Sequence, residues 1–110
     1  MSLTVAMLDR SIAEDVLAEH ERADAKHGAQ TDLPDGTSPD FVALADFART
    51  SCQQSFARGE GTWADILAEE FFEALAEEDP AALRAELVQV SSVAQRWIRA
   101  IDLRGADAKP

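Results

Sequence analysis

The stretch WADILAEEFFEALAEEDPAALRAELVQV, residues 63–90, decides the fold of this chain. Apolar residues recur at helical spacing on both sides of its Asp79-Pro80 pair, with glutamates interleaved among them. Proline is favoured at the first position of a helix, so the pattern predicts that one helix ends and another begins at this pair. A short connection of this kind predicts an antiparallel helical hairpin.

Two glutamates fall where apolar residues are expected. At about 100° per residue, Glu70 lies between Ile66 and Trp63 on the first helix of the hairpin. Glu86 lies within the apolar stripe of the second helix, beside Trp97. Ionised side chains are costly in a core unless something pairs with them. The pattern therefore predicts that both carboxylates face a shared site.

The register of the hairpin brings two further residues to the same place. Counted outward from the turn, Glu73 and Glu86 are equidistant, and so are Glu70 and Gln89. Three carboxylates and one amide oxygen are therefore expected to converge, and like charges so close would repel one another. A divalent cation removes this conflict, and oxygen ligands indicate Mg²⁺, with Mn²⁺ also possible, rather than zinc.

Structural ion pairs are the alternative to a metal. Single E-x-x-E pairs are common in helices, and Glu70 or Glu86 can instead pair with a buried arginine. Candidates for that role are Arg22, Arg49 and Arg96. Two such pairs on core-facing arcs, mirrored across one turn, favour the metal site.

The pattern of the whole chain predicts four helices and no strands, which together form an all-α, four-helix bundle. Residues 1–104 are expected to form a single helical domain and residues 105–110 a frayed tail. The fourth helix is expected to end near Leu103. Residue types that start or stop helices divide the chain. They are Gly28, Ser38 with Pro39, the RGEG of residues 58–61, Thr62 with Asp65 as a capping box, and Gly105.

Composition excludes several classes of protein. The net charge of -11 repels phosphate backbones, so no nucleic-acid partner is expected. Hydrophobic residues make up 46% of the chain, which is typical of a folded protein, yet no apolar run reaches membrane-spanning length. The N-terminus lacks the pattern of a signal peptide, which predicts a cytoplasmic protein without a membrane partner. Cys52 is the one cysteine, so a disulfide within the chain is excluded, and it is expected in the core.

The acidic motif carries a family resemblance. Glu69-Glu70-x-x-Glu73 followed by Glu86-x-x-Gln89 resembles the E-E-x-x-E and E-x-x-D signature of MazG-like, all-α nucleoside triphosphate pyrophosphohydrolases. The resemblance covers the third and fourth predicted helices and implies a MazG-like bundle. The KHGAQTDLPDG of residues 26–36 also resembles the end of the first helix in one branch of that family.

The resemblance implies a reaction and its residues. The family hydrolyses a nucleoside triphosphate to the monophosphate and pyrophosphate with Mg²⁺. Glu70, Glu73 and Glu86 would be metal ligands, and Glu69 would orient or deprotonate the attacking water as the catalytic residue. Gln89 stands where the family has an aspartate; its amide oxygen can coordinate a metal but adds no charge.

Three basic residues near the end of the first helix, Arg22, Lys26 and His27, are candidates for binding the substrate's phosphates, although a solvated helix end explains them equally well. Apolar residues on more than one side of the helices predict a homodimer or homotetramer. Two other functions stay open. One is a non-catalytic relative that binds metal or nucleotide; the other is a helical interaction protein whose carboxylates are neutralised by arginines.

Overall fold

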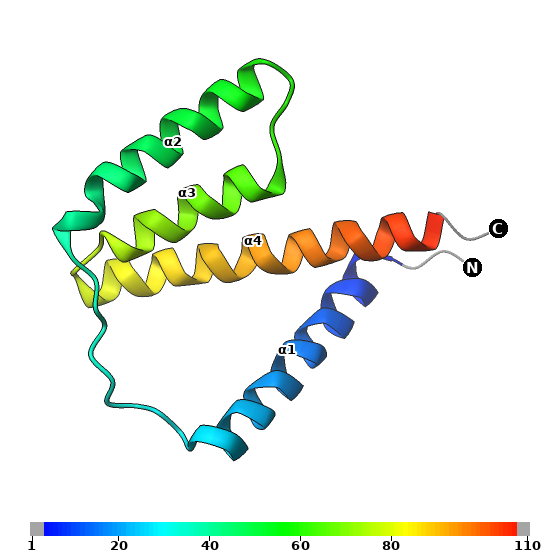
Figure 1. Ribbon diagram of the computed structural model, residues 1–110. Helices are drawn as coiled ribbons and strands as arrows, with labels where there is room; N and C mark the ends of the chain where they lie inside the picture. The colour runs from blue at the N-terminus through cyan, green and yellow to red at the C-terminus, as the bar shows by residue number, and fades with distance from the viewer. Residues whose placement is uncertain (1–3, 108–110) are drawn as a thin grey trace. The chain divides into compact units, whose positions relative to one another are not determined.

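The computed structural model describes residues 4–107, and within this range the chain is all-helical, without strands (Figure 1). This confirms the predicted all-α class and the four helices. The elements are α1 (Val5–His27), the short 3-10 helix η1 (Pro39–Phe41), α2 (Val42–Ala57), α3 (Trp63–Leu75) and α4 (Pro80–Asp107).

The helices belong to two compact units. The larger unit, residues 35–94, contains η1, α2, α3 and the first half of α4. The smaller unit contains residues 4–34 and 95–107, that is α1 and the second half of α4. The expected single domain over residues 1–104 stays a prediction. No helix within residues 4–107 combines the length and apolar character needed to cross a membrane.

Side-chain caps fix where the helices of the larger unit begin. Thr62 and Asp65 form the predicted capping box at the start of α3: the Thr62 hydroxyl accepts from the Asp65 amide, and the Asp65 carboxylate accepts from the Thr62 amide. Ser38 caps η1 by accepting from the Asp40 amide. The amide of Ser38 also donates to the carbonyl of Leu75 at 2.9 Å, which ties the start of this region to the end of α3.

The connection between α3 and α4 is longer than the sequence predicts. The expected end of the third helix at Asp79 is wrong, because α3 ends at Leu75. The Asp79 amide donates to the Glu77 carboxylate, and the Asp79 carboxylate accepts from the Ala82 amide at 2.9 Å. Asp79 is therefore committed to capping α4 and does not extend α3.

The predicted end of the fourth helix near Leu103 is also wrong. Helix α4 passes Gly105 and ends at Asp107. A glycine inside a helix costs about 1 kcal/mol relative to alanine, which does not by itself stop a helix of 28 residues. The predicted frayed tail therefore begins with helical residues, and its last three, 108–110, lie outside the described residues. At the other end of the chain, α1 stops at Gly28 as predicted, where a φ of 75° suits glycine.

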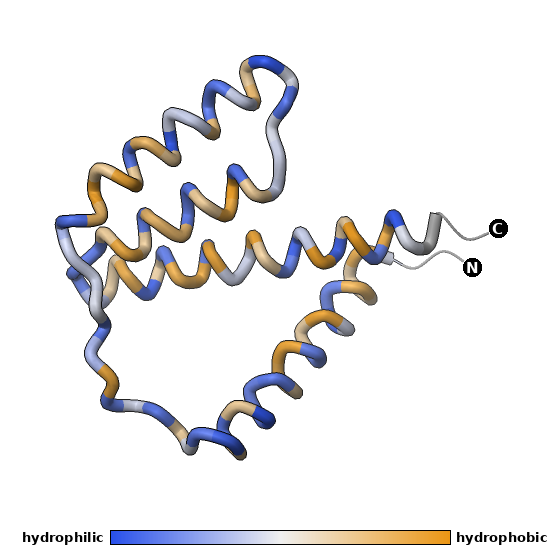
Figure 2. Tube along the Cα trace, in the orientation of Figure 1, coloured by the Kyte–Doolittle hydropathy of each residue, from blue (hydrophilic) through white to orange (hydrophobic). Residues whose placement is uncertain are grey.

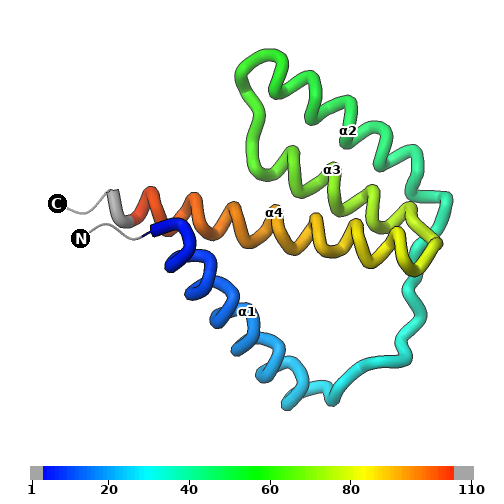
Figure 3. Tube along the Cα trace, turned by 180° about the vertical axis from the view of Figure 1, so that it is seen from behind, coloured from blue at the N-terminus to red at the C-terminus, as the bar shows by residue number. Residues whose placement is uncertain are grey.

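Small side chains dominate the core of the larger unit. Helices α2 and α3 lie side by side in both views of the chain (Figures 1 and 3), and α3 carries the more apolar sequence (Figure 2). Burial of Cys52 confirms its predicted core position. The buried hydrophobic residues of this unit are Ala45, Ala48, Cys52, Ala74, Leu83 and Val93. In the smaller unit Leu8 and Ile12 are buried, and Arg99 pairs with Asp9 at 3.1 Å.

Candidate metal centre

Three glutamates from two helices converge in the larger unit. Glu70 and Glu73 lie on consecutive turns of α3, and Glu86 lies on the second turn of α4. One carboxylate oxygen from each residue lies within 4.8 Å of the other two. All three side chains are partly buried. The structure thus places together three of the four residues that the sequence pattern assigns to a metal.

Local sequence explains the convergence. The capping box of Thr62 and Asp65 fixes the start of α3, and Glu70 and Glu73 follow on its inner turns. Asp79 fixes the start of α4, and this determines how far along the helix Glu86 lies. Because helix positions three or four residues apart share a face, these caps also determine which side chains meet.

The cluster combines buried carboxylate oxygens with closely spaced acidic groups. One oxygen of Glu70 and one of Glu86 are fully buried, and within residues 4–107 that Glu86 oxygen accepts no hydrogen bond. Burial raises the pKa of Glu73, and the neighbouring Glu69 and Glu86 carboxylates raise it further. The Arg49 guanidinium opposes this rise without cancelling it. An additional cation would therefore stabilise the ionised cluster.

Arg49 on α2 supplies a positive charge at the edge of the cluster. Its Nε lies 3.5 Å from Glu73 Oε1, and its Nη1 lies 2.9 Å from Asp46 Oδ1. The hydrogen bond to Asp46 is the main reason that the pKa of Arg49 is raised. The alternative in which an arginine pairs with Glu70 or Glu86 stays a prediction; of its candidates, Arg49 forms its ion pairs with Glu73 and Asp46. Another candidate, Arg22, pairs with Glu19 on its own helix.

A cavity of about 430 Å³ opens beside the cluster, between the start of α2 and the facing parts of α3 and α4. Its charged lining consists of Asp46, Arg49, Glu73, Glu77 and Glu86. Carboxylates thus dominate the lining, and Arg49 is its positive member among the described residues. The cavity gives a ligand access to two of the three clustered glutamates.

Sequence reasoning did not place Asp46 and Arg49 together at this cavity. A signal exists, because each follows a buried alanine, Ala45 or Ala48, by one position on α2. Residues next to the buried stripe of a helix lie at its edge, where they reach the boundary between two helices. The pattern shows this edge only after the buried face of α2 is known.

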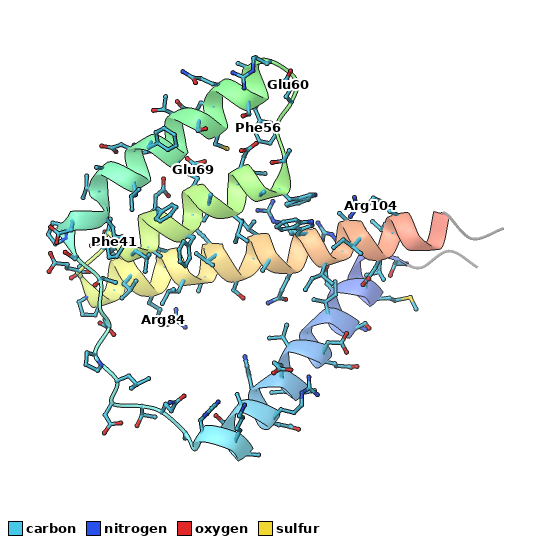
Figure 4. All side chains as sticks on the ribbon, viewed as in Figure 1. Phe41, Phe56, Glu60, Glu69, Arg84 and Arg104 are labelled. Atoms are coloured by element: carbon cyan, nitrogen blue, oxygen red, sulfur yellow. The ribbon has the colours of Figure 1, made fainter. Side chains whose placement is uncertain are left out.

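Glu69, the predicted catalytic residue, lies between α2 and α3 (Figure 4). Burial, and then a hydrogen bond to the Glu69 carboxylate, raises the pKa of the Cys52 thiol to about 11. Cys52 is therefore a neutral thiol at physiological pH. Because Glu69 also raises the pKa of Glu73, its charge acts on the glutamate cluster.

The other predicted site residues are exposed. Gln89 is exposed on α4, one turn beyond Glu86, and is not among the residues that line the cavity. Arg22, Lys26 and His27 are exposed at the end of α1, which belongs to the smaller unit. Their assigned roles in binding metal or phosphate stay predictions.

The cluster has the chemistry of a site for a hard divalent cation. Mg²⁺ binds carboxylate oxygens at about 2.0–2.1 Å and keeps several waters, so it needs few protein ligands. Oxygens within 4.8 Å of one another can reach one such ion through small side-chain movements. A bound ion would also remove the repulsion that raises the pKa of Glu73.

Comparison of the chain with known proteins finds no matching family model, no matching curated protein and no matching solved structure. The resemblance to MazG-like enzymes therefore stays a prediction from the acidic motif.

The raised pKa of Glu73 predicts how stability depends on pH in the absence of divalent metal. Below its ordinary value of 4.5, the carboxyl group is protonated in both the folded and unfolded states, and its contribution to stability is complete. As pH rises through the higher folded-state pKa, the folded protein must ionise Glu73 beside two other carboxylates, and this contribution is lost. Urea unfolding in EDTA at pH 5 and pH 7 should therefore show a smaller loss of stability for Glu73→Gln than for the wild type.

Glu78→Gln is the matched control, because Glu78 is exposed beyond the end of α3. It should lose as much stability between the two pH values as the wild type. Equal losses in all three proteins would show that Glu73 does not titrate against its neighbours.

Proposed function

We propose that this protein is a nucleoside triphosphate pyrophosphohydrolase that depends on Mg²⁺, with Mn²⁺ as a substitute. The observation that carries the proposal is the group of three glutamate oxygens, from α3 and α4, within 4.8 Å of one another. The E-E-x-x-E and E-x-x-Q motifs on these helices support it, since they resemble the MazG-like signature. In this proposal α3 and α4 form the antiparallel hairpin of a MazG-like bundle.

The proposed roles follow from position and chemistry. Glu70, Glu73 and Glu86 would hold Mg²⁺, with the amide oxygen of Gln89 as a fourth ligand. Mg²⁺ would bind phosphate oxygens and neutralise the charge that develops during attack on phosphorus. Glu69 would orient a water molecule or accept its proton, from a position on α3 whose charge reaches the cluster.

The reaction is an addition of water to a phosphorus atom of the triphosphate. The new bond joins the water oxygen to the phosphorus that carries the nucleoside, and the bond from this phosphorus to the pyrophosphate breaks. The products are the nucleoside monophosphate and pyrophosphate, and the proton from water passes to Glu69. No redox partner is needed.

A second candidate is a non-catalytic MazG-like module or helical interaction protein. The Arg49–Glu73 ion pair favours the helical interaction protein, because an arginine already neutralises part of the cluster. Two findings favour the metal instead: a Glu86 oxygen is buried without a hydrogen bond from the described residues, and the pKa of Glu73 stays raised. Metal dependence and turnover separate the alternatives.

A homodimer or homotetramer is part of the proposal. Large apolar side chains are exposed on helices α2 and α4, and Phe47 on α2 is 72% exposed. Contiguous exposed apolar surface is typical of a surface that another protein covers. Among the exposed hydrophobic residues of these two helices are Val42, Leu44, Phe47, Leu87, Val88 and Ile98.

Metal binding should stabilise the protein. A cation that binds the folded state in large excess over its dissociation constant adds about 1–3 kcal/mol, which raises Tm by about 5 °C or more in a chain of this size. Thermal unfolding with and without millimolar Mg²⁺ or Mn²⁺ measures this shift. Glu70→Gln and Glu86→Gln should lose most of it, whereas Glu78→Gln should keep it. An unchanged Tm of the wild type would remove the basis of the metal site.

Turnover tests the enzyme itself. We expect the wild type with Mg²⁺ to release pyrophosphate from at least one member of a panel of standard and modified nucleoside triphosphates. Glu70→Gln should lower kcat by about 100-fold or more, because each ligand positions the ion that neutralises the transition state. Metal binding without release of pyrophosphate from any member would favour the non-catalytic module.

Gln89 decides whether the metal site has three protein ligands or four. If its amide oxygen is a ligand, Gln89→Leu should raise the Mg²⁺ concentration for half-maximal pyrophosphate release several-fold. Gln89→Asp should lower it, because a carboxylate is the stronger ligand for Mg²⁺. Superimposable titration curves for Gln89→Leu and the wild type would assign the site to the three glutamates alone.

A further inference from the structure

The Arg49 guanidinium has more N–H donors than its two ion pairs engage. Arg49 lines the cavity together with Glu73 and Glu86; its Nη1 donates a hydrogen bond to Asp46, and its Nε forms an ion pair with Glu73. A guanidinium has five N–H donors, so these contacts leave other N–H groups for a ligand. The Arg49 side chain is 43% exposed, which keeps the group accessible from the cavity.

The pairing of Arg49 with Glu73 competes with metal binding. A divalent ion on Glu73 would lie within a few ångströms of the guanidinium, and two cations so close repel each other. The Nε–Oε1 contact of 3.5 Å is long and partly exposed, so it is inexpensive to break. The 2.9 Å hydrogen bond to Asp46, on the same helix, does not involve Glu73.

The negative charge of the cavity lining opposes the binding of a phosphate group. Within the described part of the chain, the lining carries four carboxylates, Asp46, Glu73, Glu77 and Glu86, and one positive charge, that of Arg49. A phosphate group would be repelled until a metal ion neutralises part of this lining. Once Glu73 binds the metal, Arg49 loses that partner and can form charge-assisted hydrogen bonds with phosphate oxygens.

On these grounds, and resting on the proposed function, we propose that Arg49 exchanges partners: it pairs with Glu73 in the metal-free protein and binds a substrate phosphate once metal occupies the glutamates. Arg49 is thus a specificity-determining residue for a phosphorylated ligand, and it makes phosphate binding follow metal binding. The exchange predicts that one substitution of Arg49 raises the affinity for the metal and lowers the affinity for the phosphate ligand.

The experiment measures two affinities by calorimetry on the full chain. With Mn²⁺ alone, Arg49→Gln should bind the ion about three- to fivefold more tightly than the wild type, because the competing cation is gone. With saturating Mg²⁺, Arg49→Gln should bind pyrophosphate about tenfold more weakly, because a charge-assisted contact is lost. Arg49→Lys should bind Mn²⁺ as the wild type does and lose part of the pyrophosphate affinity, since it keeps the charge without the planar fork.

Arg84→Gln is the control for net charge, because Arg84 is exposed on α4 and points away from α3 (Figure 4). It should match the wild type in both titrations. Tighter Mn²⁺ binding by Arg49→Gln with unchanged pyrophosphate binding would overturn the exchange, and so would no change in either titration. If the wild type binds no Mn²⁺, the proposed function fails and this proposal fails with it. If the wild type binds Mn²⁺ but Arg49→Gln behaves like Arg84→Gln, the role of Arg49 alone fails.

Discussion

The larger unit must hold three glutamate side chains close together in spite of their mutual repulsion. Two rigid helices hold Glu70, Glu73 and Glu86 with their oxygens within 4.8 Å, and burial removes much of the water that would screen them. A fold of this size has only a small stability margin, so the repulsion within such a cluster is a substantial cost to the free energy of folding. The cavity lies beside the cluster, and Arg49 is the basic residue of its lining among the described residues.

Local sequence accounts for most of the secondary structure. Gly28, Ser38 with Pro39, and the Thr62–Asp65 box mark helix boundaries through interactions within a few residues, and the structure has these boundaries. The convergence of Glu73 with Glu86 could also be predicted, because counting from a short connection requires only helical geometry. The connection is in fact longer, since Asp79 caps α4, yet these residues still meet.

What depends on contacts between distant segments could not be predicted. Phe47 and Leu44 on α2 are largely exposed, while Ala45, Ala48 and Cys52 are buried, so hydrophobicity alone does not identify the packed face of this helix. Periodicity places an apolar stripe but does not say which neighbour covers it. For the same reason the sequence did not predict which carboxylate forms an ion pair with Arg49. Glu73 became its partner through the packing of α2 against α3, which leaves no periodic signal in either helix.

The balance of charge links the two ligands of the proposed site. A chain with a net charge of -11, and a cavity lined by four carboxylates and one arginine, cannot attract a free polyanion. In the proposed exchange, a metal-bound phosphate would meet a different surface, since the ion would bind the glutamates and release the guanidinium of Arg49. The acidic character, from which no nucleic-acid partner is expected, is thus compatible with the proposed metal–triphosphate complex. A second arginine in the lining would neutralise the glutamates permanently and would compete with the ion that is proposed to bind them.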